Sequence, residues 1–209
     1  MEHANEYDTG TGAMIARGES WVLKRMAVGV ERYPGYGERL RVETWSSGIS
    51  GSKGYRDFRV FAGGDEVVIR GSSLWVYVSM AARSIVPIPR EVADGFPSDP
   101  EGIFCPNLED LVLAGPRQDA ADVLTVSLRY SDFDANDHVN NAAYADVLQT
   151  GLASLGRPVR PRNIRIKYGR GIPAETTGVE VRLASLVDGA GCSFSIARGA
   201  SLFAQGDLA

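Results

Sequence analysis

The chain has 209 residues, of which 44% are hydrophobic and 23% charged, which is enough to build one large or two small buried cores. Its net charge of −4 argues against a protein that binds nucleic acid over its whole surface. No apolar run approaches the length of a membrane span, and the polar, acidic start of the chain argues against a secretory signal. Cys105 and Cys192 have no metal-binding or redox spacing, which favours reduced thiols in a cytoplasmic protein.

The first half of the chain predicts antiparallel strands joined by short turns. Residues 1–18 have no clear period, and we expect them to be disordered or the remnant of an element. Strands are then predicted at residues 21–30, 40–45, 55–61 and 67–79. Glycine-rich turns, one of them at residues 48–54, separate these segments, so we expect a meander without parallel crossovers.

The middle of the chain is rich in proline and predicts a linker. Six prolines lie within residues 86–120 and interrupt any long regular element. We expect at most one short helix there, near residues 108–113, with Asn107 as its cap.

The pattern of regular elements then resumes. A helix is predicted at residues 142–155, because Tyr144, Val147, Leu148, Gly151 and Leu155 fall on one face at helical spacing. Asn140 or Asn141 can cap its start. Strands are predicted at residues 123–128, 163–168, 178–186, 192–198 and 201–205.

A short polar segment ahead of this helix carries the residues best suited to catalysis. Asp134, Asn136 and His138 recur at every second position, which can place all three side chains on one side of an extended backbone. A carboxylate can activate water or attack a carbonyl, and an imidazole can move the proton at neutral pH. The free N–H groups at a helix start can stabilise the oxyanion that forms. The set is sufficient in kind for hydrolysis of an acyl group without a metal or an organic cofactor.

The same residue types also suit two other structures. Asp and Asn commonly cap turns and helices, so the segment could be a purely structural turn. A calcium loop would also start with Asp132, Asp134 and Asn136, but it requires a glycine at its sixth position and a glutamate at its twelfth, and both are missing.

Residues 132–144 resemble the active-site segment of the plant and bacterial acyl-ACP thioesterases, which are double hotdog proteins. The first half supports the resemblance independently, because further motifs occur in the order that this family shows. They lie at residues 21–25, 33–34, 43–45, 55–58, 73–76, 83 and 88–92. The resemblance spans about residues 18–205, and the ordered sum of these weak motifs is fairly specific.

The resemblance implies an α+β fold of two tandem hotdog repeats, each an antiparallel sheet that wraps a helix. We expect an incomplete N-terminal repeat at residues 19–95, a linker at 96–120 and a C-terminal repeat with the active site at 121–209. The family's catalytic Asp, Asn and His fall on Asp134, Asn136 and His138, and single-hotdog acyl-CoA thioesterases also place their Asp on Asp134. Asn140, Asn141 and Tyr144 are expected to position the substrate.

Two departures from the family pattern stand out. The family's Glu on the strand after the helix would fall on Gly171, and Glu175, four residues later, is a candidate to replace it. The first repeat also lacks its initial strand and helix. Its sheet would then expose apolar surface unless a partner covers it, and a homodimer is one way to do so.

The expected partner is acyl carrier protein with a phosphopantetheine-linked acyl chain. A run of basic residues could dock this acidic protein, or could be the solvated face of a strand; its main candidates are Arg160, Arg162, Arg165 and Lys167. Trp45, Trp75 and Tyr77 could line an acyl tunnel or belong to the sheet core.

Three alternatives to an acyl-ACP thioesterase remain open. An acyl-CoA thioesterase of the same superfamily would share the site. A catalytically weak acyl-binding protein is favoured by Gly171 and the short first repeat. A hotdog dehydratase is disfavoured by the ordered motifs of the first half.

Overall fold

The structure is a computed structural model that describes residues 14, 16–113, 115–116, 121–134, 136–186, 189 and 191–209. The chain divides into two compact units. The first comprises Met1–Met26 and Pro34–Asp110, and the second comprises Ala27–Tyr33 and Leu111–Ala209. No described helix is long and apolar enough to cross a membrane.

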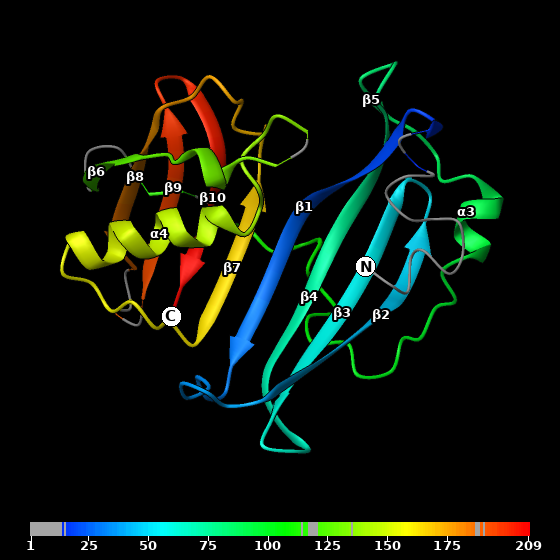
Figure 1. The fold of residues 1–209 in the computed structure, drawn as a ribbon, viewed down its shortest axis with the longest axis horizontal. Helices are drawn as coiled ribbons and strands as arrows, with labels where there is room; N and C mark the ends of the chain where they lie inside the picture. The colour runs from blue at the N-terminus through cyan, green and yellow to red at the C-terminus, as the bar shows by residue number, and fades with distance from the viewer. Residues whose placement is uncertain are drawn as a thin grey trace. The chain divides into compact units, whose positions relative to one another are not determined.

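The first unit is built on an antiparallel meander (Figure 1). Its elements are β1 (Glu19–Val30, up to Met26 in this unit), β2 (Leu40–Ser50), β3 (Lys53–Ala62), β4 (Glu66–Ser79), β5 (Ser84–Ile85) and α3 (Arg90–Asp94). The strand order is β2-β3-β4-β1, with β5 paired to β4. The predicted strands and the β2–β3–β4 meander are confirmed. The expectation that all four strands follow one another in the sheet is wrong, because β1 lies beside β4.

The predicted turn at residues 48–54 is also shorter than expected. The β2–β3 register shifts between Ser46 and Gly48, and β2 continues through this irregularity to Ser50. Gly51, with a φ of 61°, makes the turn itself. Gly48 therefore marks an irregularity within the strand, while the chain reverses only at Gly51.

The start of the first unit contributes to its core. Met14 is buried with Tyr77 and Val92, and the Trp21 ring meets the Tyr77 ring edge-on at 4.9 Å. Tyr77 therefore belongs to the core. Residues 1–13 and 15 lie outside the described residues, so a disordered or remnant N-terminus stays a prediction for them.

The proline-rich segment is folded onto the first unit up to Asp110. Asp57, only 2% exposed, accepts a hydrogen bond from the backbone N–H of Phe104 at 2.9 Å and others from two serine hydroxyls. The short helix lies at α3, so its prediction near residues 108–113 is wrong. The backbone there forms turns, because the N–H groups of Leu108 and Asp110 bond three residues back.

The second unit is an antiparallel sheet with one long helix across its face (Figure 1). Its elements are β6 (Asp122–Ser127), η2 (Tyr130–Asp132), α4 (Ala143–Ser154), β7 (Asn163–Tyr168), β8 (Gly178–Ser185), β9 (Cys192–Arg198) and β10 (Ser201–Leu208). The strand order is β7-β10-β9-β8-β6. All five predicted strands and the predicted helix are confirmed, with β10 three residues longer than expected.

The apolar face of α4 packs on this sheet. Tyr144, Val147, Leu148 and Gly151 are buried as predicted. A Cβ on Gly151 would lie 2.7 Å from a methyl carbon of Val181 on β8, so glycine allows the close approach of helix and strand. The fifth predicted contact, Leu155, is instead the half-buried residue at which the helix ends.

Candidate active site

The loop at residues 133–139 carries all three candidate catalytic residues and joins η2 to α4. Two backbone hydrogen bonds close it, from Asp134 N–H to His138 O and from Asn140 N–H to Asp132 O, both at 2.8 Å. Phe133 and Val139 pair as an antiparallel bridge within it. The residues predicted from their alternation are therefore held together by a tight backbone ladder.

The imidazole of His138 has a defined orientation. Its Nδ1 lies 2.7 Å from the backbone oxygen of Asn136, and the side chain is exposed. A carbonyl oxygen can only accept, so the neutral ring carries its proton on Nδ1 and donates it there. Nε2 is then left with a free lone pair, which is the state required of a general base.

Asp134 and Asn136 are linked to each other as well. One carboxylate oxygen of Asp134 accepts the backbone N–H of Asn136 at 2.8 Å, which is the Asx-turn bond of the capping interpretation. The other oxygen has no hydrogen-bond partner among the described residues. Asp134 is half-buried and Asn136 is exposed. The segment is therefore an Asx turn, as in the capping interpretation. The turn still leaves one carboxylate oxygen of Asp134 and the side-chain amide of Asn136 available to a ligand.

A cavity of about 470 Å³ opens beside the imidazole, wholly within the second unit. Its lining residues are His138, Arg170, Gly171, Pro173, Glu175, Thr176, Arg198, Ser201 and Phe203. The structure thus brings Glu175 into the same cavity as His138, while Asp134 and Asn136 do not line it. No group of His, Cys, Asp and Glu within the described ranges could hold a metal ion.

Gly171 lies against the imidazole. A Cβ built on Gly171 would be 2.5 Å from Cδ2 and 3.2 Å from Nε2 of His138. The backbone here is also fixed, because Val139 N–H donates to Ile172 O at 2.9 Å and His138 pairs with Pro173 as a bridge. The ring in this orientation therefore requires glycine at position 171.

The three residues expected to position substrate have different surroundings. The side chain of Asn140 accepts the Ala142 N–H at 2.9 Å, which forms an Asx turn just ahead of α4. The N-cap of α4 is Ala142 and it has no side-chain cap hydrogen bond, so the prediction that Asn140 or Asn141 caps this helix is wrong. Asn141 is exposed. Tyr144 is 2% exposed and meets the Tyr168 ring edge-on at 5.3 Å, and burial raises its pKa to about 12. Tyr144 therefore supports the site from the core and does not line the cavity.

The four basic docking candidates are all exposed, on β7 and the segment before it. Three of them already have partners. Arg160 lies over the Tyr33 ring, Arg162 donates to Glu31 O at 2.6 Å, and Arg165 pairs with Asp207 at 2.6 Å. Lys167 has no partner among the described residues.

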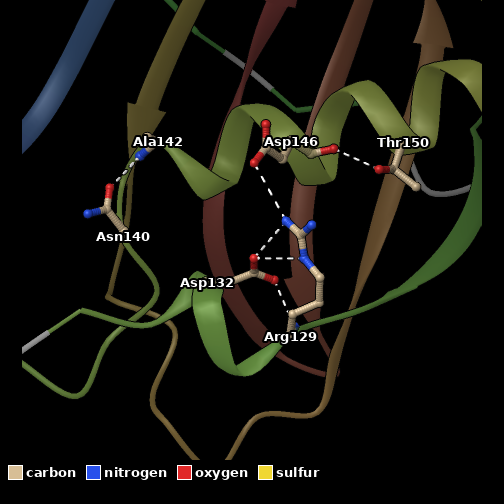
Figure 2. Close-up of polar contacts among 6 residues, drawn as sticks. All are labelled: Arg129, Asp132, Asn140, Ala142, Asp146 and Thr150. Atoms are coloured by element: carbon tan, nitrogen blue, oxygen red, sulfur yellow. Dashed lines mark hydrogen bonds and ion pairs between the residues drawn. The ribbon is translucent and has the colours of Figure 1, made fainter.

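Arg129 and Asp132, which were not predicted as site residues, form a polar cluster beside the loop (Figure 2). Asp132 is 4% exposed, and its carboxylate accepts the backbone and side-chain N–H groups of Arg129. The signal was present as an Arg and an Asp three residues apart, a spacing at which the two side chains can pair across one turn.

Comparison with known proteins places this site in a family. The acyl-ACP thioesterase N-terminal domain matches residues 2–96, and the acyl-ACP thioesterase C-terminal domain matches residues 116–196. The chain belongs to the acyl-ACP thioesterase family. The family's two domains thus follow each other in this chain, and the candidate loop lies in the C-terminal one.

Curated acyl-ACP thioesterases from plants are similar in sequence. A dodecanoyl-[acyl-carrier-protein] hydrolase of Cinnamomum camphora is 34% identical over 165 residues, 75% of this chain and 42% of that protein. A palmitoyl-acyl carrier protein thioesterase of Arabidopsis thaliana is 31% identical over 170 residues, 77% of this chain and 40% of that protein. The chain therefore spans less than half the length of these relatives.

Solved structures show the fold. A 12:0-ACP thioesterase from Umbellularia californica has a TM-score of 0.82 at 23% identity, covering 99% of this chain and 83% of that one. An acyl-ACP thioesterase from Bacteroides thetaiotaomicron has a TM-score of 0.80 at 20% identity, with the same coverage. The fold is the double hotdog of acyl-ACP thioesterases, and the prediction of this fold is confirmed.

Proposed function

We propose that this protein hydrolyses fatty acyl-ACP to free fatty acid and acyl carrier protein. Water adds to the thioester carbonyl carbon, the C–S bond breaks, and the leaving thiolate takes up the proton lost by water. The observation that carries the proposal is the orientation of His138, whose Nε2 is free to accept that proton beside a cavity. The printed names of the curated relatives supply the substrate class.

Asp134 and His138 share the activation of water in this proposal. The free carboxylate oxygen of Asp134 holds the attacking water or attacks the carbonyl itself, and His138 moves the proton. Glu175 is a second carboxylate in the cavity and a candidate to replace the acidic group that the family resemblance places at Gly171.

Asn136 orients the thioester carbonyl through its exposed side-chain amide. The start of α4 offers fewer free donors than a bare helix end, because Asn140 accepts both the Ala142 N–H and the Ala143 N–H. Oxyanion contacts from the backbone would therefore have to come from other N–H groups near Asn141. Asn140, Asn141 and Tyr144 hold the approach to the loop in place.

The carrier and the domain arrangement belong to the same proposal. Acyl carrier protein docks on the surface formed by Arg160, Arg162, Arg165 and Lys167, all of which are exposed. We assign the repeats to residues 19–95 and 121–209, with a linker at 96–120 and a first repeat shortened at its N-terminus. The assignment also includes a homodimer and a cytoplasmic location, the latter in keeping with Cys105 and Cys192 as reduced thiols.

A thiol-release assay tests this function. One acyl chain is offered to the wild-type protein on acyl carrier protein and on CoA. We expect kcat/KM to be at least about tenfold higher with the protein carrier, because charge complementarity speeds encounter. Equal or better turnover of acyl-CoA would favour the acyl-CoA thioesterase, and no release from either carrier would refute hydrolysis.

A catalytically weak acyl-binding protein is the second candidate, and Gly171 is the observation that favours it. The cavity has no side chain at that position, so the acidic group expected there is missing. Such a protein would bind acyl-ACP with ordinary affinity and release thiol only at the rate of the uncatalysed reaction. Binding of acyl-ACP in a separate titration, together with no thiol release above the uncatalysed rate, would identify it.

A further inference from the structure

The carboxylate of Asp132 lies at the base of the candidate catalytic loop, and the proposed mechanism does not use it. Its two oxygens accept the Arg129 backbone N–H at 2.7 Å and the Arg129 Nε–H at 3.0 Å, while the guanidinium Nη2 lies 2.8 Å away. Only 5% of its side-chain surface is exposed. Because a buried carboxylate is stable only when it is fully hydrogen-bonded, this contact fixes the position of Asp132 firmly.

The backbone of the same residue closes the loop. Asp132 O accepts the Asn140 N–H at 2.8 Å. The next residue pairs into the loop are the Phe133–Val139 bridge and then the Asp134–His138 hydrogen bond. A change in the position of Asp132 is therefore passed along this ladder to His138. The backbone N–H of Asp132 also donates to Arg129 O at 3.0 Å, so backbone and side chain of Asp132 are both held by Arg129.

Arg129 also reaches α4. Its Nη2 lies 3.6 Å from a carboxylate oxygen of Asp146, so the guanidinium stands between the η2 turn and the helix (Figure 2). This outer contact is well exposed on both sides and should contribute little. At the other end of the loop, the Asn140 side chain is bonded to Ala142 N–H (Figure 2). The loop is thus held at both ends, and the Asp132 end is the buried one.

We propose that Asp132, held by Arg129, is a positioning residue that keeps the loop in the conformation in which His138 Nδ1 donates to Asn136 O and His138 lines the cavity. The role in catalysis rests on the proposed function, whereas the role in orienting the imidazole does not.

Two measurements on Asp132→Asn test the proposal separately. The nitrogen chemical shifts of His138 report which ring nitrogen carries the proton, and a His138→Gln variant distinguishes its signals from those of His3. In the wild type we expect the proton on Nδ1, and in Asp132→Asn a mixture of both tautomers. In the thioester assay we expect kcat to fall about 10- to 100-fold with KM changed less than about threefold, because misplaced catalytic groups cost this much.

The matched control is Asp122→Asn, which removes another arginine–aspartate pair of the second unit, that with Arg157 at 2.8 Å. It should leave both readouts unchanged. If Asp132→Asn does not fold, Arg129→Gln keeps the backbone hydrogen bond and removes the guanidinium, and it should show the same tautomer mixture. A wild-type tautomer in whichever variant folds would overturn the proposal. Thioester inactivity of the wild type would refute the proposed function and leave the tautomer result to decide this inference.

Discussion

The imidazole of His138 lies against the backbone of Gly171, so closely that a Cβ at position 171 would come within 2.5 Å of ring carbon Cδ2. Moving the ring away would break the hydrogen bond between its Nδ1 and Asn136 O. Glycine at this position and the orientation of the histidine are therefore two parts of one arrangement. A side chain at position 171 would therefore require a different position of the imidazole.

The first prediction concerns Gly171 itself. Gly171→Ala should displace the imidazole and lower kcat about 10- to 100-fold, since the added methyl group overlaps the ring. Gly171→Glu should be at least as slow, although it introduces the carboxylate that the family resemblance expects. Thiol release from acyl-ACP measures both variants. A rate gain in Gly171→Glu would mean that the native protein is an impaired enzyme with room for that side chain.

The second prediction uses the charge of Asp132. Burial raises the pKa of this carboxyl group, but hydrogen bonds from the Arg129 backbone and side chain outweigh it, and the net pKa is lowered from 3.8. The stabilisation is therefore complete above pH 3.8 and lost as the pH falls through the lower folded-state value. Asp132→Ala should cost about 1–3 kcal/mol of unfolding free energy at pH 7.

Urea unfolding at pH 7, 5 and 3 checks the pH dependence. The difference between the wild type and Asp132→Ala should be equal at pH 7 and 5 and smaller at pH 3. A difference that stays constant down to pH 3 would show that the ionised carboxylate is not the source of the stabilisation.

The third prediction concerns carrier docking. Lys167 is the docking candidate without a partner among the described residues, so its charge can be reversed without breaking a known contact. Lys167→Glu should raise KM for acyl-ACP about 3- to 10-fold, with an effect that fades at high salt, and leave KM for acyl-CoA unchanged. Arg39→Glu, an exposed arginine of the first unit, has the same net charge change and serves as the control. An equal effect of both substitutions would rule out a local docking surface.

Much of the fold could be predicted from local patterns. Alternation found nine strands to within a few residues, because each side chain on these sheets faces either the core or solvent. What local patterns could not predict was pairing across long separations, such as β1 beside β4. The helix expected near residues 108–113 failed because tertiary hydrogen bonds, such as that between Ser72 and Cys105 N–H, hold the approaching backbone in turns.

The spacing of Asp134, Asn136 and His138 predicted three side chains on one side of the backbone. The three residues lie on one closed loop, but of the three only His138 lines the cavity, and their catalytic roles stay a prediction. The sequence could not show that Gly171 contacts the imidazole or that Glu175 shares its cavity, because both arise from the pairing of His138 with Pro173. The burial of Asp132 could not be predicted, because a buried carboxylate looks the same in sequence as an exposed one.

The most direct test of the proposed active site is the hydrolysis of one fatty acyl-ACP by the wild-type protein and by Asp134→Ala and His138→Ala, with circular dichroism to confirm folding. We expect the wild type to release free fatty acid and thiol, and each folded variant to lose about 100-fold or more of this activity. Full activity in both variants would contradict the assignment of this loop as the active site.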